Sequence, residues 1–150
     1  MALFQSPWVL GQKPIARPHT AHNTHSQLFI VDVPAAGFAL DDILELAVLH
    51  PYAHIIDAAI VPVGSLGAAT VDIGLMSGET GELLNANGTA RTVGAELFTG
   101  AAITAMLRLS KVDALLIPAT EKPRSIGVKF GAAVAAGAGK KIGLMLHFAQ

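Results

Sequence analysis

The stretch GAGKK at residues 137–141 is the first candidate for chemistry, because a glycine followed by a lysine occurs in phosphate-binding loops. In the phosphate loop GxxxxGK[ST], an earlier glycine precedes this pair, a hydroxyl residue follows the lysine, and a helix comes next. Gly139 and Lys140 match, but Val134 and Lys141 occupy the positions of the earlier glycine and the hydroxyl. The residues that follow alternate like a strand. We therefore interpret the stretch as a turn and predict no cofactor.

Three histidines recur at three-residue spacing near the N-terminus, namely His19, His22 and His25. Imidazoles spaced in this way could gather around a metal ion on a helix or a polyproline-like segment. No carboxylate stands near them in the sequence to complete a ligand set, and the chain contains no cysteine. We therefore predict a solvated polar segment rather than a metal site.

The residue types of a hydrolase are present without the arrangement that a hydrolase needs. The sequence lacks the GxSxG elbow, which holds a nucleophilic serine at a strained turn between a strand and a helix. Asp57 and Asp72 lie within apolar segments and could form a pair of carboxylates. Polar residues on the outward faces of half-buried strands are the ordinary explanation for both. The sequence therefore predicts a protein that is not an enzyme and has no catalytic residues.

The composition indicates a single domain whose surface is poor in charge. The chain has 150 residues, of which 52% are hydrophobic and 14% are charged, and a formal net charge of −1. A typical globular protein has about a quarter of its residues charged. A protein with so little charge either exposes an apolar exterior or covers much of its surface with partners, and the second is the commoner solution. We therefore expect an assembly role.

The charges are divided along the chain. Residues 1–27 carry two bases and no acid, residues 28–99 carry nine acids and one base, and residues 100–150 carry seven bases and two acids. Segments of opposite sign can attract one another within one fold or between neighbouring copies. The near-neutral total argues against nucleic acid as the main partner, because phosphate binding needs clustered Lys and Arg.

Neither a membrane segment nor a leader is predicted. No apolar window approaches the roughly 18 to 20 residues needed to span a membrane. The N-terminus lacks the basic cluster and apolar core of a signal peptide. We therefore expect intracellular synthesis and no membrane partner.

Short apolar segments bounded by turn signals are typical of strands. Residues 38–51 fit either a short helix or a strand with Leu44, Leu46 and Val48 facing inward, and we favour the strand because Pro51 ends the segment early. Residues 69–78 alternate most regularly, and residues 78–92 form the longest loop. The predicted strands in this half of the chain are 27–33, 38–51, 53–64 and 69–78.

The second half of the chain gives a more mixed pattern. Residues 93–107 are rich in alanine and could hold one short helix, although two glycines oppose it. Residues 107–130 are predicted as strand, strand, loop and strand. Two alternating segments, at 126–130 and 142–148, flank a glycine-containing link and are predicted to form a hairpin.

These elements predict an all-β fold, an antiparallel β-sandwich of jelly-roll or Greek-key type with at most one short helix. We place the sandwich at residues 27–150. Residues 1–26 contain three prolines and little periodicity, which predicts an extended N-terminal arm.

The arm supplies the candidate contacts with other subunits, because aromatic anchors are favoured at interfaces. The alternative is that Trp8 folds back and plugs the base of its own sandwich. The candidate contact residues are Phe4, Trp8, Val9, Lys13 and Arg17.

Four segments of the chain together resemble a family of small virion proteins encoded beside the capsid genes of tailed bacteriophages. They are VDVPAAGFALDDILELAVLHPYAHIIDAAIVPVG (31–64), ATVDIGLMSGETGE (69–82), GAELFTG (94–100) and KPRSIGVKF (122–130). The similarity extends from about residue 27 to about residue 148. These are loose structural motifs, so no active-site residues are carried over.

The resemblance implies a capsid decoration or cement protein, which binds the outer surface of the phage head and bridges capsomers to stabilise the shell. Its partners would be the major capsid protein and further copies of itself, in a small closed oligomer such as a trimer or a dimer. It would be made in the host cytoplasm and end on the capsid surface. Two alternatives remain: a head-fibre, tail or baseplate subunit, and a carbohydrate-binding module on the particle surface.

Overall fold

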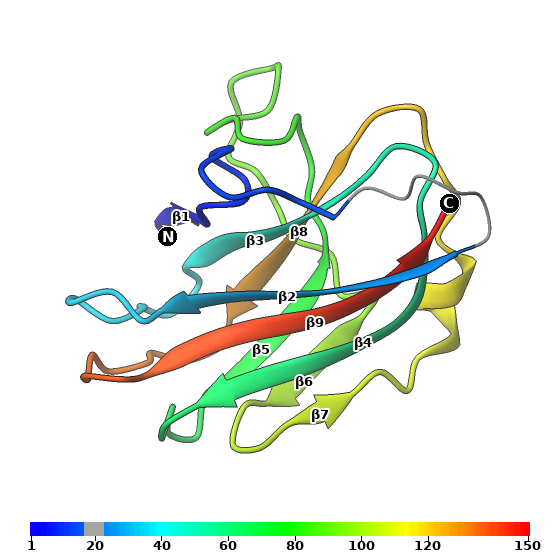
Figure 1. The fold of residues 1–150 in the computed structure, drawn as a ribbon. Helices are drawn as coiled ribbons and strands as arrows, with labels where there is room; N and C mark the ends of the chain where they lie inside the picture. Colours follow the sequence, from blue (N-terminus) through cyan, green and yellow to red (C-terminus); the bar gives the residue numbers. More distant parts are fainter. Residues whose placement is uncertain (17–22) are drawn as a thin grey trace.

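The computed structural model describes residues 1–16 and 23–150, which fold into two β-sheets packed face to face (Figure 1). The predicted all-β sandwich is confirmed. The five-stranded sheet has the order β1 (Leu3–Gln5), β3 (Ile43–Leu49), β8 (Arg124–Phe130), β5 (Thr70–Leu75) and β6 (Phe98–Ala102). The four-stranded sheet has the order β2 (Thr24–Asp32), β9 (Lys141–Ala149), β4 (His54–Val63) and β7 (Leu107–Arg108).

The strand β3 is buried along its whole length. A strand covered on both faces has a nearly continuous apolar sequence, which explains why residues 38–51 fitted a helix or a strand equally well. A β-bulge between Glu45 and Ala47 changes the phase of the alternation. Leu44, Leu46, Ala47 and Leu49 therefore belong to the core cluster, as predicted for the first two. Val48, which was also predicted to face inward, is buried outside that cluster.

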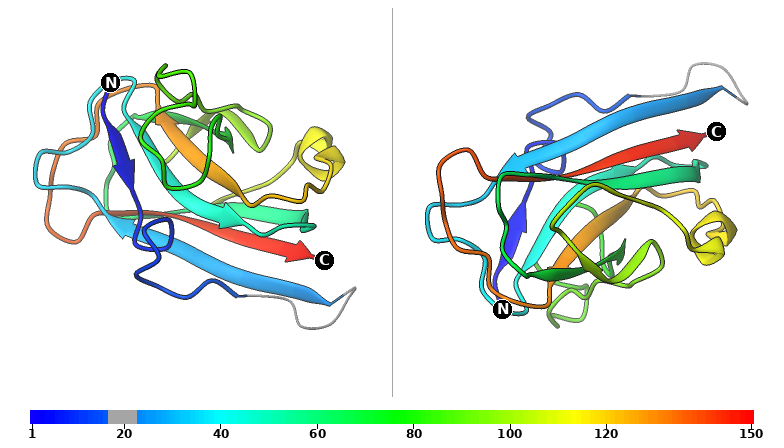
Figure 2. Two further views of the ribbon diagram at one scale, coloured as in Figure 1. Left: turned by 90° about the horizontal axis from the view of Figure 1, so that it is seen from above. Right: turned by 90° about the horizontal axis from the view of Figure 1, so that it is seen from below.

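The predicted C-terminal hairpin is wrong. The two segments are strands, but β8 lies in the five-stranded sheet, between β3 and β5, whereas β9 lies in the four-stranded sheet, between β2 and β4. The link between them crosses from one sheet to the other (Figure 2). Its GAGKK stretch is a turn in which Gly139 has a φ of 76°, and Lys140 Nζ donates to the Ala135 carbonyl at 3.0 Å.

The short helix that residues 93–107 could have held is not formed, because this segment contains β6. Pairing with β5 supplies the backbone hydrogen-bond partners that override the helix propensity of the alanines. The second strand predicted after residue 107 is the 3-10 helix η1 (Val112–Leu116), which follows the two-residue β7. No helix within residues 1–16 and 23–150 is long and apolar enough to cross a membrane.

The N-terminal segment is integrated into the sandwich. β1 pairs in parallel with β3 at the edge of the five-stranded sheet, and residues 14–16 run along β2, where the Gln27 side chain bonds the Pro14 carbonyl and the Ala16 amide (Figure 2). The domain boundary predicted between residues 26 and 27 lies inside β2, which begins at Thr24. A strand of only three residues leaves no periodicity in the sequence, so β1 could not be predicted from it.

Candidate assembly surface

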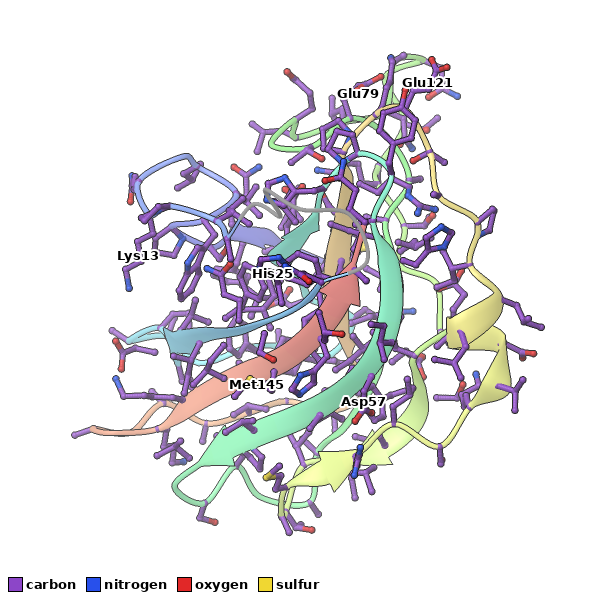
Figure 3. All side chains as sticks on the ribbon, turned by 45° about the vertical axis from the view of Figure 1, so that its right-hand side comes forward. Lys13, His25, Asp57, Glu79, Glu121 and Met145 are labelled. Carbon is purple, nitrogen blue, oxygen red and sulfur yellow. The ribbon has the colours of Figure 1, made fainter. Side chains whose placement is uncertain are left out.

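The outward face of the four-stranded sheet carries two adjacent rows of apolar residues. The register of β2, β9 and β4 aligns Ile30, Gly143 and Val61 in one row, and Leu28, Met145 and Ala59 in the next. The residues between them on each strand, such as Phe29, Leu144 and Ile60, point into the core and are fully buried. Figure 3 shows Met145 and Asp57 side by side on this sheet, where both line one shallow depression. We call the six residues of the two rows the apolar sheet face.

An apolar outward face is unusual for an antiparallel sheet, whose solvent side normally carries polar residues. Further exposed hydrophobic side chains extend this face beyond the rows, including Ile56 at 44% and Met106 at 67% exposure. Near its centre, at Gly143, the face has no side chain. A Cβ atom on Gly143 would lie 2.9 Å from the Phe29 carbonyl oxygen, so this position excludes a side chain.

Polar residues bound the apolar sheet face at both ends. At one end, Lys141 Nζ lies 2.5 Å from Asp32 Oδ1. At the other end, Ser26, His147 and Asp57 align in one row, and Ser26 Oγ lies 2.6 Å from His147 Nδ1. At this second end, Arg108 of β7 lies 2.5 Å from Asp57. The four charged side chains of the two rims therefore form two ion pairs within the chain. A dry apolar centre with a polar rim is the usual anatomy of a protein interface.

The row of Ser26, His147 and Asp57 is not arranged as a catalytic triad. Asp57 Oδ2 accepts a hydrogen bond from Arg108 Nε at 2.6 Å, and Oδ1 accepts one from the Ala58 amide at 2.9 Å. Within the described part of the chain, no hydrogen bond joins Asp57 to His147. Asp72, the other candidate carboxylate, lies on β5 in the opposite sheet and accepts from the Gly100 amide. The two aspartates therefore do not form a pair.

The Asp57 and Arg108 pair makes stability depend on pH. The pKa of Asp57 is lowered from 3.8, chiefly because Arg108 donates a hydrogen bond to the carboxylate, although desolvation opposes this shift. A carboxylate with a lowered folded-state pKa stabilises the fold above its unfolded-state pKa, and this contribution disappears as the pH falls through the folded-state value. We expect the difference in unfolding free energy between wild type and Arg108→Ala to be largest near neutral pH and to shrink below about pH 4.

Urea unfolding at a series of pH values measures this difference. Lys140→Ala is the control, because the Lys140 ammonium bonds a backbone carbonyl rather than a carboxylate. A difference for Arg108→Ala that stays constant from pH 7 to pH 3 would contradict the assignment.

Two of the predicted contact residues stabilise the chain's own fold. Trp8 is only 7% exposed, and its ring packs edge-on against Phe29 with centroids 5.3 Å apart. Phe4 packs in the same manner against Phe38 at 5.0 Å. For Trp8, the structure therefore has the alternative arrangement, in which the ring folds back into its own sandwich.

The other predicted contact residues are placed differently. Val9 is half-buried and lines a cavity beside Trp8. Lys13 is exposed, and its Nζ lies 4.6 Å above the centre of the Trp8 ring. Arg17 lies outside the described residues. A role of these residues in contacts with a capsid or another subunit stays a prediction.

Of the three histidines considered as metal ligands, only His25 lies in the described part of the chain, where its ring stacks on Phe148. His19 and His22 lie outside it. Within residues 1–16 and 23–150, no group of three or more His, Asp or Glu side chains is placed to hold a metal ion.

An apolar sheet face bounded by internally paired charges has the anatomy of a protein interface. The chain is 34% identical to a chain of the capsid of Ralstonia phage GP4, with a TM-score of 0.83; the match covers 99% of this chain and 98% of that one. A chain of the cyanophage Pam1 capsid asymmetric unit shares the fold, with 13% identity, a TM-score of 0.56 and coverage of 93% and 94%. No protein-family model and no curated protein matches the chain.

The chain belongs to the family of phage capsid proteins that is represented by this chain of the Ralstonia phage GP4 capsid. It is a structural protein of a phage virion. The resemblance predicted from the sequence is confirmed to this extent.

Proposed function

We propose that the protein is a capsid decoration, or cement, protein. It binds the major capsid protein on the outer surface of the phage head and bridges neighbouring capsomers. The apolar sheet face carries this proposal, because family membership places the protein in a virion and this face combines exposed apolar side chains with a rim of paired charges. Synthesis takes place in the host cytoplasm, and the finished particle carries the protein on its surface.

The proposed mechanism is physical. A protein that binds only the closed shell raises the free energy needed to separate capsomers, in proportion to the logarithm of its free concentration over its Kd. Binding of many copies, each in a small oligomer such as a trimer, adds contacts through effective concentration. The charge rims are neutralised within the chain, so binding leaves Asp57 and Asp32 with their partners and does not bury unpaired charges.

The test is to incubate the purified, fluorescently labelled protein with heads that lack it, and to measure bound copies per head and the survival of heads on heating. We expect saturable binding at many copies per head and survival at a higher temperature. A handful of copies per head would overturn the proposal and favour a head-fibre, tail or baseplate subunit.

A substitution in the apolar sheet face locates the contact. Met145→Asp places a charge in the centre of the face, and we expect it to weaken binding to heads by more than about tenfold, because a charge without a partner is costly to desolvate. Leu40→Asp is the matched control, since Leu40 is 58% exposed in the connection before β3, away from this face. Equal binding of both variants would contradict the role of the face, provided that both unfold at the wild-type midpoint.

A further inference from the structure

The long connection between β5 and β6, residues 76–97, is anchored by a wholly buried ion pair. Arg91 Nη1 lies 2.8 Å from Glu45 Oε1 on β3, and neither side chain has any exposed surface. Arg91 also donates to the carbonyls of Ser77 and Glu82, both at 2.7 Å. The arginine therefore fastens two points of its own loop to the five-stranded sheet. We call residues 76–97 the pinned loop.

Further hydrogen bonds reinforce this anchor from three elements. The Glu45 carboxylate accepts from the Gly81 amide at 3.1 Å and from Gln5 Nε2 of β1 at 2.9 Å. Ser125 of β8 donates to the same carboxylate, and Gln5 Nε2 reaches the Gly81 carbonyl at 2.7 Å. A loop of this length without its own strands is usually functional or disordered. These bonds hold it in one conformation.

The pinned loop presents two leucines to solvent. Leu83 is 64% exposed and Leu84 is 52% exposed. Arg91 is buried against Glu45, so the exposed charges around the leucines are those of Glu79 and Glu82. Glu79 pairs with Lys122, whereas Glu82 forms no ion pair among the described residues. The tip of the loop is therefore apolar with an acidic margin.

A complementary cavity lies at the same end of the sandwich. It has a volume of about 550 Å³ and is lined mainly by apolar side chains, without an acidic residue: Trp8, Val9, Ile15, Val48, His50, Pro51, Tyr52, Thr80, Pro123 and Gln150. The Lys13 ammonium lies 4.6 Å above the Trp8 ring, and Figure 3 shows this side chain extending outward. Residues 1–27 carry no acid at all. The cavity is therefore apolar, with a basic margin on the side of the N-terminal segment.

We infer that Leu83 and Leu84 of one copy dock into the Trp8 and Tyr52 cavity of a second copy, with Glu82 of the first facing Lys13 of the second. The inference rests on the oligomer included in the proposed function and names the surface that forms it. Thr80 of the pinned loop lines the cavity of its own chain, so both partners of the contact lie at one end of the molecule (Figure 1). Two copies can then exchange loops reciprocally, or several can close a ring.

Backbone strain at Tyr52 is consistent with this role. Tyr52 has a φ of 61°, which is uncommon for a bulky residue, and its side chain stays 53% exposed at the cavity. Its amide donates to the Thr120 carbonyl at 2.8 Å, which fixes the turn. Strain of this kind is retained mainly where the side chain has a function. Here it places an aromatic ring beside the incoming leucines.

Cysteine cross-linking tests the contact directly, because the chain has no cysteine of its own. Leu84→Cys and Tyr52→Cys are made as separate proteins with different tags, mixed and oxidised. We expect a mixed disulfide-linked dimer at several times the yield obtained from Leu84→Cys mixed with Leu40→Cys. Equal yields in the two mixtures would overturn the inference.

Sedimentation velocity of the full chain gives an independent readout. We expect wild type to self-associate, Leu84→Ser to weaken self-association about tenfold, and Glu82→Lys and Lys13→Glu each to weaken it. The double variant with both charges exchanged should recover it. A monomeric wild type, or no recovery in the double variant, would contradict the contact.

These outcomes separate the inference from the proposed function. If the wild-type protein binds heads at many copies but the cysteine variants give no specific cross-link, the inference is wrong and the decoration role still holds. A specific cross-link together with no binding to heads supports the inference and removes the decoration role.

Discussion

Replacing Arg91 by methionine is expected to lower the free energy of unfolding by about 3 to 5 kcal/mol, the usual cost of removing one partner of a buried ion pair. The substitution leaves the Glu45 carboxyl group with no exposed surface and without its cation. It also leaves the Ser77 and Glu82 carbonyls without the hydrogen bonds that Arg91 donates. The midpoint and slope of urea unfolding, followed by far-UV circular dichroism, measure the change.

Two further variants isolate the buried charge as the cause. Lys122→Met breaks the pair with Glu79, whose side chains are 75% and 60% exposed, and is expected to have little effect. Glu45→Gln combined with Arg91→Met removes the unpaired charge while keeping hydrogen-bonding groups, and should be more stable than Arg91→Met alone. If Arg91→Met were as stable as Lys122→Met, the loop would not be held by this ion pair.

Replacing Trp8 by alanine is expected to destabilise the protein by about 3 to 5 kcal/mol, as for other large aromatic side chains removed from a core. The indole is buried against Phe29 of β2, while β1, just before it, pairs with β3. Loss of the ring would therefore leave a cavity between the N-terminal segment and both sheets. Thermal and urea unfolding measured by circular dichroism give the change in stability.

The control for Trp8→Ala is Leu10→Ala, in the same segment but with 49% of the leucine exposed. It should unfold within a few tenths of a kcal/mol of wild type. Trp8 is the only tryptophan, so its fluorescence in wild type should change with the same midpoint as the circular dichroism. Equal stability of the two variants would mean that the N-terminal segment is an arm that packs only against partners.

Strand positions could be predicted from the sequence because alternation is a local property. β5 follows Val71, Ile73 and Leu75 as expected, and β2, β4 and β8 lie close to their predicted segments. Strand partners are not local. The sequences of β8 and β9 indicate two strands and a turn, and nothing in them specifies that each pairs in a different sheet.

The candidate surface could not be predicted for a related reason. Leu28, Ile30 and Met145 are of the same types as core residues, so an apolar outward row and an apolar inward row look alike in the sequence. One sequence feature did indicate an apolar outward face: the β4 segment HIIDAAIVPV is apolar on both faces over much of its length. The aromatic residues of the N-terminal segment were predicted as subunit contacts instead, because interface anchors and core residues share the same chemistry.

The ion pair between Arg91 and Glu45, which anchors the pinned loop, could not be predicted from the sequence either. Arg91 was the single base among nine acids in residues 28–99, and this isolation is a signal for a paired arginine. Which of the nine acids it meets depends on the packing of the loop over β3. The sequence does not define that packing.

The most direct test of the decoration role is a cryo-electron microscopy map of heads saturated with the protein. The predicted result is repeated density on the outside of the shell, with β2, β9 and β4 turned toward the major capsid protein and the apolar sheet face in contact with it. Density confined to a single vertex or to the tail, or a sandwich bound with this sheet facing solvent, would contradict the account.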